Sequence, residues 1–343
     1  MSRLGKIARR SFLVGSAALL GGVAFGTYVY KRPVDNPLLD DLPEGDAAIT
    51  PYVLITPTGI TLITPRADKG QGTVSVQAAL LAEELDVELD QITPSFGVPS
   101  AAYYNGKVAG EGFPFATTDD GVISSLLHNQ VSELAGKALG IQITGGSSTV
   151  PDAYEKLRHA GAVARETLKA AAARKTGIAV DQLKTAKAAV ILPDGTALPY
   201  TDLAGIAATI DPVTDVTLRP SSAWRMLGKP MPRIDMVAKS TGTQTYGIDL
   251  TFDGMVHATV RTNPAWGGVM NSFDATEAKS MRGVQQIVPV TNGVAVVADN
   301  TWRAIQAANA ITFDWGPAPY LASSGEMWDE FGASFIDDRQ DSQ

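Results

Sequence analysis

Cysteine is absent from all 343 residues of this chain. The protein therefore forms no disulfide, and it cannot itself ligate an iron–sulfur cluster, a thiolate zinc ion or a covalently attached c-type haem. Histidine is scarce too, with three in the chain, at positions 128, 159 and 257. These histidines lack the spacing of metal ligands. No G-x-S-x-G motif of an activated serine occurs either. A redox centre of the excluded kinds would have to lie on a partner protein.

Positive charge is in short supply outside the N-terminus. The chain has 28 lysines and arginines against 36 aspartates and glutamates, a formal net charge of -8. Six of the basic residues and none of the acidic ones fall in residues 1–32, so the remainder has 22 basic residues and a net charge of -14. Such an acidic body argues against nucleic acid as a partner. The hydrophobic fraction of 45% is typical of a globular protein, and 343 residues are enough for two or three domains.

The N-terminus places Arg9-Arg10 just before residues 12–30, an uncharged run of apolar and small residues. Paired arginines beside such a run are typical of a twin-arginine export signal, and an ordinary buried helix does not explain them. Residues 1–32 are therefore predicted to direct export to the periplasm, and residues 33–48 to form an exposed linker. The run is about long enough to span a bilayer and has no distinct cleavage site, so a cleaved signal and a retained membrane anchor both stay open.

Two glycines and three hydroxyl-bearing residues stand directly before a long helical pattern, namely Gly145, Gly146, Ser147, Ser148 and Thr149. Glycines let a backbone approach a ligand closely, and the first N–H groups of a helix, at the positive end of its macrodipole, attract an anion such as phosphate. The alternative is a simple cap, in which Ser148 or Thr149 caps the helix and Pro151 occupies its first turn. By itself the segment favours the cap, because caps are far commoner than phosphate sites.

A similar turn, Gly70-Gln71-Gly72, opens an earlier predicted helix with an apolar face. It has neither the third glycine of a dinucleotide-binding fingerprint nor the Gly-Lys-Ser/Thr end of a P-loop. Lys69, just before it, could meet a phosphate but is expected to be a solvated charge. The acid pair Glu83-Glu84 is expected to lie on a solvated helix face.

Periodicity and turn signals divide the rest of the chain into short elements. They predict hairpins at residues 52–64 and 188–199, a loop at 93–118, a helix capped by Thr118-Asp119, a long helix ending at Gly177 and a short helix at 200–209. Four prolines make residues 211–235 an extended connector. A compact α+β unit follows at 255–315. A terminal helix then carries Trp328, Phe331 and Phe335 on one side, which needs a covering partner.

Several segments together carry a family resemblance. They are Asp68-Lys69-Gly70-Gln71-Gly72, Ala82-Glu83-Glu84-Leu85-Asp86, Ile141-Gln142-Ile143-Thr144-Gly145-Gly146-Ser147-Ser148-Thr149, Leu157-Arg158-His159-Ala160-Gly161-Ala162, Leu227-Gly228-Lys229-Pro230-Met231-Pro232-Arg233-Ile234-Asp235 and Tyr246-Gly247-Ile248-Asp249. In this order, the chain resembles the N-terminal part of the large, molybdopterin-binding subunit of xanthine-oxidase-type molybdenum hydroxylases. The branch is that of the isoquinoline 1-oxidoreductase beta subunit and the periplasmic aldehyde dehydrogenases.

The resemblance implies an α+β fold in which a mixed α/β molybdopterin-binding portion precedes a smaller α/β hammerhead-like domain. It implies a partial molybdopterin-binding domain at residues 49–210, a connector at 211–235, the hammerhead-like domain at 236–316 and an acidic tail at 317–343 with a partner-binding helix. The cofactor implied is a molybdopterin dinucleotide with molybdenum. The residues implied to lie against it are Gly70, Gln71, Gly72, Gln142, Gly145, Gly146, Ser147, Ser148 and Thr149.

The reaction implied is the hydroxylation of an aldehyde or nitrogen heterocycle with oxygen from water. Electrons would pass to [2Fe–2S] clusters on a small subunit and then to haem c of a cytochrome, which agrees with the absence of cysteine. The family's catalytic glutamate has no match in this chain, so no catalytic or metal-binding residue is assigned. The sequence therefore predicts that another polypeptide carries the rest of the molybdenum-binding region. The alternative is a truncated or non-catalytic exported binding or assembly protein that retains the fold.

Overall fold

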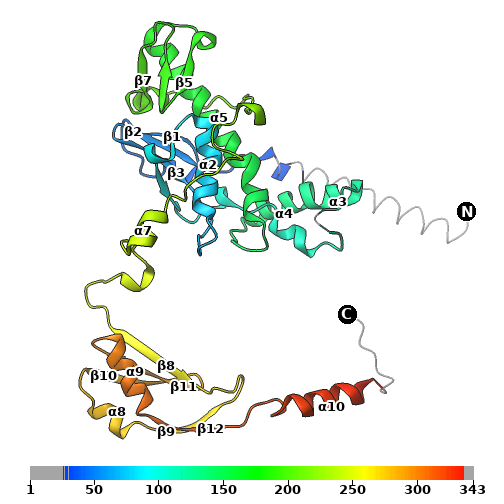
Figure 1. Cartoon of the computed structure of the whole chain (residues 1–343), viewed down its shortest axis with the longest axis vertical. Coiled ribbons are helices and arrows are strands. Elements are labelled where there is room, and N and C mark those ends of the chain that lie inside the picture. Colours follow the sequence, from blue (N-terminus) through cyan, green and yellow to red (C-terminus); the bar gives the residue numbers. More distant parts are fainter. Residues whose placement is uncertain (1–25, 27, 30, 117, 336–343) are drawn as a thin grey trace, which may run out of the picture. The chain divides into compact units, whose positions relative to one another are not determined.

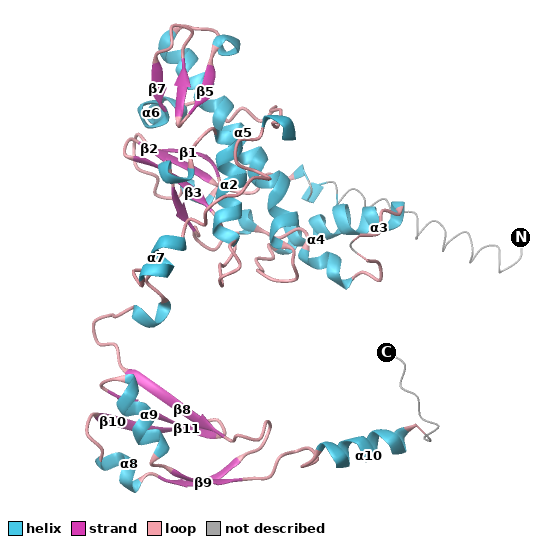
Figure 2. Ribbon diagram, viewed as in Figure 1, coloured by secondary structure: helices cyan, strands magenta, loops and turns pink. Residues whose placement is uncertain are grey.

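The computed structural model describes residues 26, 28–29, 31–116 and 118–335, and the chain divides into two compact units, Met1–Gln244 and Thr245–Gln343 (Figure 1). The predicted export signal lies almost wholly outside the described residues, so it stays a prediction. None of the helices in the described part combines the length and apolarity that crossing a bilayer demands. Helices and strands alternate in both units, which confirms the predicted mixture of the two (Figure 2).

The first unit begins with a four-stranded sheet. Its strands are β1 (Ala47–Thr50), β2 (Val53–Thr56), β3 (Gly59–Ile63) and β4 (Thr93–Ser95), in that order, antiparallel except that β4 runs parallel to β3. The hairpin of β2 and β3 confirms the pattern around its Pro-Thr-Gly turn. Two strands differ from expectation, because β1 begins inside the predicted linker and β4 lies in the predicted loop. Both strands are short, and they are stabilised by pairing with neighbouring strands, which local sequence patterns do not reveal.

Two long helices, α2 (Thr73–Leu85) and α5 (Thr149–Thr176), pack against each other and against this sheet. Their backbones come close at Gly161, where a Cβ would lie 2.5 Å from the carbonyl oxygen of Leu81. The predicted end of α5 is confirmed, since Gly177 follows it in the left-handed conformation with φ 77°. The predicted apolar face of α2 is too narrow, because the helix is buried almost all round.

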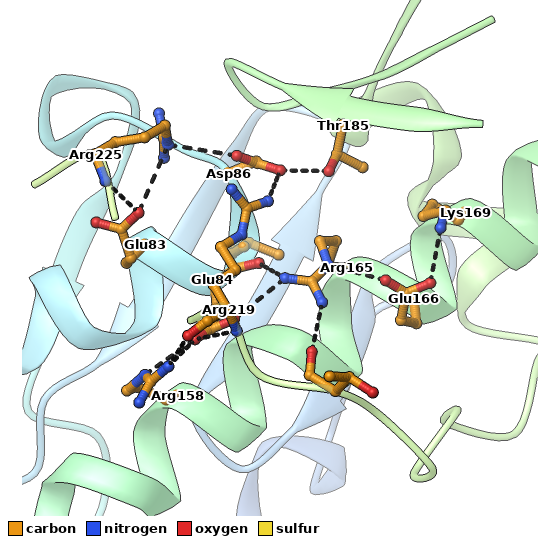
Figure 3. Close-up of polar contacts among 12 residues, drawn as sticks. Glu83, Glu84, Asp86, Arg158, Arg165, Glu166, Lys169, Thr185, Arg219 and Arg225 are labelled. Atoms are coloured by element: carbon orange, nitrogen blue, oxygen red, sulfur yellow. Dashed lines mark hydrogen bonds and ion pairs between the residues drawn. The ribbon is translucent and has the colours of Figure 1, made fainter. Parts of the chain in front are cut away.

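The expectation that Glu83 and Glu84 are solvated is wrong. Both side chains are fully buried at the C-terminal end of α2, where Glu84 meets three arginines (Figure 3). Its Oε1 accepts hydrogen bonds from Nε and Nη2 of Arg158 at 2.9 and 2.7 Å, and its Oε2 lies 3.3 Å from Nη1 of Arg165. The backbone N–H of Arg219 also donates to Glu84. A buried carboxylate is tolerated here because charge and hydrogen bonds replace its hydration.

Glu83 holds the predicted connector onto the first unit. It accepts hydrogen bonds from the backbone N–H groups of Arg225, Met226 and Leu227 at 2.8, 2.7 and 3.1 Å. Burial acts to raise the pKa of Glu83, but these donors and the Arg225 charge outweigh it and lower the pKa. Residues 211–235 are irregular, as the prolines predicted, yet they pack against α2 and do not form a free linker.

Residues 106–140 leave the core and return to it. The backbone N–H of Asn105 donates to the carbonyl oxygen of Ile141 at 2.6 Å, which closes the excursion at its base. Its helices run without a break through α3 (Val122–Leu126), η5 (Leu127–Val131) and α4 (Ser132–Leu139). The predicted helix is present but begins after Gly121, and Asp119 accepts a bond from the N–H of Gly121 instead of capping the helix.

A small sheet and short helices complete the first unit. Strands β5 (Lys184–Ala186), β6 (Ala189–Ile191) and β7 (Ala197–Pro199) form an antiparallel sheet that contains the predicted second hairpin. Helices α6 (Ala204–Ala207) and α7 (Met236–Thr241) follow. Asp86, after α2, accepts hydrogen bonds from the Thr185 hydroxyl and the Arg219 guanidinium, which ties β5 to the ionic cluster (Figure 3).

The second unit is a separate α+β fold. The order β10 (Val284–Val290), β11 (Gly293–Ala298), β8 (His257–Thr262) makes one antiparallel sheet, and β9 (Met270–Asp274) pairs with β12 (Thr312–Trp315). Helices α8 (Thr276–Ser280) and α9 (Thr301–Asn309) cover a core that includes Val294, Val296 and Ala307. The sequence predicted a compact α+β unit in this region, and the structure contains one. The hammerhead assignment stays a prediction.

The predicted terminal helix is present as α10 (Ser324–Ser334), which a capping box of Ser323 and Glu326 opens. Trp328, Phe331 and Phe335 are exposed, and the first two rings pack edge to face. The helix therefore displays the aromatic side that the sequence pattern predicted.

Replacing Glu83 with Gln should destabilise the chain by about 1–3 kcal/mol, because an amide nitrogen would face backbone N–H donors that now share a buried acceptor. Urea unfolding followed by circular dichroism measures the change. Glu88→Gln is the matched control, since Glu88 also pairs with Arg225, at 2.6 Å, but is half exposed and should cost about 0–1 kcal/mol. Equal losses in the two variants would contradict the assignment.

The contribution of Glu83 should also depend on pH. Because its folded-state pKa is lowered, the stabilisation is present above the ordinary glutamate pKa of about 4.3 and is lost as the pH falls through the lower folded value. The difference in unfolding free energy between wild type and Glu83→Gln should therefore be largest near neutral pH and shrink in acid. A difference that stays constant in urea titrations from neutral to acidic pH would contradict this sign.

Candidate functional site

The two glycine-rich turns, 73 residues apart at Gly72 and Gly145, line one pocket of about 450 Å³ at the N-terminal ends of α2 and α5. Backbone, hydroxyl and cationic groups face it together with two valines. The lining residues are Lys69, Gln71, Gly72, Thr73, Val76, Thr144, Gly145, Ser147, Thr149 and Val150. Its volume falls within the range of small-molecule sites.

The first turn needs its glycines. Gly70 and Gly72 have φ angles of 106° and 87°, which residues with a Cβ rarely adopt. Asp68 accepts hydrogen bonds from the N–H groups of Gly70 and Val74 at 2.8 and 3.2 Å, so its carboxylate stands at the start of α2. Burial acts to raise the pKa of Asp68, but the backbone donors outweigh it and lower the pKa. The positive end of α2 is therefore already partly neutralised.

Arg233, near the end of the connector, holds the first turn through a hydrogen bond to its backbone. Its Nη1 donates to the carbonyl oxygen of Gly70 at 2.9 Å, and a Cβ on Gly72 would lie 3.6 Å from its guanidinium. Its Nη2 lies 3.8 Å from Asp68 Oδ1 and its Nε lies 3.4 Å from Asp235 Oδ1, distances too long for good hydrogen bonds. The Arg233 charge therefore compensates Asp68 within the turn.

The second turn leaves its helix end open. Gly146 and Ser147 both adopt left-handed φ angles, 57° and 50°, and the N–H of Ser148 donates to the carbonyl oxygen of Gly145 at 3.2 Å. Ser148 is the N-cap of α5 by position, but its side chain makes no capping hydrogen bond. The N–H groups of Thr149 and Val150 belong to the first turn of α5, which has no intrahelical acceptors for them. This helix end therefore offers donors and a positive dipole to an anion.

Ser148 itself serves the fold. Its hydroxyl donates to the carbonyl oxygen of Gly145 at 2.7 Å and accepts from Nδ2 of buried Asn105, also at 2.7 Å. The same Nδ2 donates to the carbonyl oxygen of Ile143 at 3.0 Å. Asn105 thus holds the turn in shape.

A hydrogen bond and an ion pair tie the two turns together. The N–H of Ala67 donates to Oγ1 of Thr144 at 2.9 Å, and Nη2 of Arg66 lies 2.8 Å from Oδ2 of Asp152. Both side chains of this ion pair are buried, and Asp152 also accepts from Nζ of Lys156 at 2.7 Å. The relative position of the two turns is therefore built into the core of the unit.

The structure brings five of the nine residues implied by the resemblance to the pocket lining. These are Gln71, Gly72, Gly145, Ser147 and Thr149, whereas Gly70, Gln142, Gly146 and Ser148 are not part of the lining. Gln142 lies beside the turn, where its Oε1 accepts from the N–H of Ser100 at 3.3 Å. Their role toward a cofactor stays a prediction.

Sequence reasoning did not assign Thr73, Val76, Thr144 and Val150 to the cofactor site, and they complete the lining with Lys69. Thr144 precedes the glycine pair and could have been included as a further hydroxyl of the same turn. The valines carry no signal, since apolar helix positions usually face the core.

No cluster of three or more potential metal ligands occurs among the residues that the structure describes. The histidines are separate. His128 packs edge-on against Phe113, and Nδ1 of His257 lies 3.0 Å from the Thr301 hydroxyl in the second unit. What the pocket can do is bind an anion and orient it between two helix ends.

The pocket thus has glycine-rich turns at two helix N-termini, an arrangement that suits an anion. No family model matches the chain. Curated relatives do, and each is an oxidoreductase by name. The chain is 26% identical to the beta subunit of isoquinoline 1-oxidoreductase from Brevundimonas diminuta, over 95% of this chain and 42% of the relative. It is likewise 26% identical to a membrane-bound aldehyde dehydrogenase of Gluconacetobacter polyoxogenes, over 98% and 42%.

A third relative, a nicotinate dehydrogenase subunit from Pseudomonas putida, is 29% identical over 73% of this chain and 19% of its own length. These similarities confirm the resemblance that the sequence motifs predicted. The chain spans less than half of the length of the relatives it matches. Among solved structures, the aldehyde oxidoreductase of Desulfovibrio gigas is 23% identical over 37% of this chain and 19% of that chain, with a TM-score of 0.26, a likeness too slight to define the fold.

Replacing Asp152 with Asn should cost about 3–5 kcal/mol, because it leaves the buried Arg66 guanidinium without its counter-charge. The pocket should loosen with it, since this ion pair fixes the two turns. Chemical denaturation gives the stability, and amide hydrogen exchange at residues 66–73 and 143–149 gives the local loosening. Glu155→Gln, an exposed change on the same helix, should stay within about 0.5 kcal/mol of wild type. A loss no larger than this in Asp152→Asn would refute the role of the pair.

Proposed function

We propose that this chain forms the cofactor-binding portion of the large subunit of a molybdenum-dependent oxidoreductase, and that the pocket between α2 and α5 holds the phosphates of a molybdopterin dinucleotide. The observation that carries the proposal is that two glycine-rich turns, distant in sequence, line one pocket at two helix N-termini. The relatives support the class of enzyme, because all three are oxidoreductases by name.

The residues present suit a diphosphate. The first-turn N–H groups of α5 and the hydroxyls of Thr144, Ser147 and Thr149 would bind phosphate oxygens, and the Lys69 ammonium would balance their charge. Asp68 makes the start of α2 the weaker of the two anion sites, so α5 would supply the main contact. Bound molybdenum would supply the oxidation chemistry, namely hydroxylation of an aldehyde or nitrogen heterocycle. This chain's own residues would fix the cofactor's position.

Partner subunits belong to the same proposal. Two of the relatives are named as subunits of their enzymes. Since this chain has no cysteine, [2Fe–2S] clusters and haem c would lie on a small subunit and a cytochrome. The paired arginines at positions 9 and 10 support export of the folded protein to the periplasm, with residues 12–30 as signal or membrane anchor.

Thr149→Asp tests the site with little risk to the fold. A carboxylate at the first position of α5 suits the helix dipole, so stability should stay level or rise, but it should repel a phosphate in the pocket. The enzyme is purified with its partner subunits from a host that makes the cofactor. Molybdenum by elemental analysis and nucleotide released by acid should both fall at least about tenfold, the equivalent of 1.4 kcal/mol or more in binding.

Thr149→Asn is the matched control, because it has a similar size without the charge and should retain the cofactor. Full occupancy in Thr149→Asp would exclude this pocket as the phosphate site while leaving the enzyme class intact. A wild-type complex without molybdenum or nucleotide would overturn the proposed function itself, and would favour an exported binding or assembly protein that retains the fold.

A further inference from the structure

The continuous helix of α3, η5 and the start of α4 buries polar residues and exposes apolar ones. Ser124 and Ser132 are buried, with exposures of 1% and 0%, whereas Val122 and Ile123 are 87% and 65% exposed. Helices on the surface of a water-soluble domain show the opposite arrangement. Leu126 and Val131 are exposed as well, and the four apolar residues form an outer face on the excursion of residues 106–140, which projects from the first unit (Figure 1).

The polar inner side gains little from its burial. The hydroxyls of Ser124 and Ser132 and Nε2 of His128 are buried without a hydrogen-bond partner among the residues the structure describes. The helix therefore turns polar side chains away from water and apolar ones outward. An apolar environment in contact with Val122 and Ile123 would explain this orientation. Several exposed apolar residues on one helix are typical of a contact with protein or membrane.

The described end of the N-terminal apolar run points to the occupant of this face. This end packs against α4, which continues the same helix. Gly26 lies beside Leu134, where a Cβ would be 3.2 Å from Cδ2, and Tyr28, Val29 and Arg32 share a cavity of about 440 Å³ with residues 137–140. The described end of the N-terminal run, residues 26 and 28–29, thus meets the folded body at the helix that carries the exposed face. Tyr28, Lys31 and Arg32 are exposed at this junction, and tyrosine and basic residues favour the water–lipid boundary.

We propose that the outer face formed by Val122, Ile123, Leu126 and Val131 rests on a lipid bilayer, beside the N-terminal apolar run. Exposed Asp119 and Asp120 precede the face, and exposed Arg32 lies at the other end of the helical segment, so opposite charges flank it. Apolar contact drives the association, and phosphatidylcholine, which is zwitterionic and has no net charge, is a sufficient surface. The contact is independent of cofactor binding, because none of these residues lines the pocket between α2 and α5.

The absence of cysteine makes the contact directly measurable. Ile123→Cys and Leu126→Cys each introduce a unique thiol for an environment-sensitive fluorophore, and Asp181→Cys, at an exposed turn of the same unit, is the matched control. The full chain is reconstituted into phosphatidylcholine vesicles, and flotation confirms that it is bound. At positions 123 and 126 the emission should shift to the blue, and brominated phosphatidylcholine should quench it several-fold more strongly than at position 181.

Each other outcome overturns the proposal. If the labels at 123 and 126 remain as open to an aqueous quencher as the label at 181, the face lies in water. If they are shielded from water but brominated lipid does not quench them, protein covers the face, whether a second copy or another subunit. If the chain does not float with vesicles, no lipid contact exists.

Discussion

The close packing of α2 against α5 is the constraint on which the first unit depends. Gly161 allows it, because any side chain there would meet the carbonyl of Leu81. The two helices begin at the same pocket, so their positive ends lie near each other, an arrangement that electrostatics disfavours. Asp68 stands at the start of α2 and offsets part of the repulsion, whereas the Asp152 carboxylate in the first turn of α5 is already paired with Arg66 and Lys156. An anionic ligand in the pocket would offset it further, which gives the site a physical reason to prefer anions.

The far end of this helix pair is stabilised in a different way. Glu83 and Glu84 lie in the core near the negative end of α2, a position that calls for strong compensation. Arginines from α5 and backbone N–H groups from the connector provide it. The connector is therefore part of the first unit in a physical sense. It supplies donors to the buried acids and then places Arg233 beneath the glycine turn at the opposite end of α2.

Sequence patterns predicted most helices and strands because their apolar spacing and turn residues are local properties. They did not show that Gly72 and Gly145 meet, since that depends on how α2 and α5 pack. The burial of Glu83 and Glu84 was missed for a similar reason, because their partners lie about 75 and 140 residues further along the chain. In α3 the helix was foreseen but its orientation was not, since apolar residues are assumed to point inward. The resemblance identified the turns as a set, which neither turn could do alone.

The hydrogen bond from Arg233 to Gly70 also determines when the pocket can form while the chain is being translated. Helices α2 and α5 can pack once residue 176 has left the ribosome, but the glycine turn then still lacks the guanidinium that holds its carbonyl. The N–H of Ile234, which donates to the Ser75 hydroxyl in the first turn of α2 at 3.0 Å, emerges equally late. A nascent chain therefore reaches its final pocket only after about 60 further residues have been translated. The pocket is thereby completed after the connector has folded back, and not during the growth of the helices themselves.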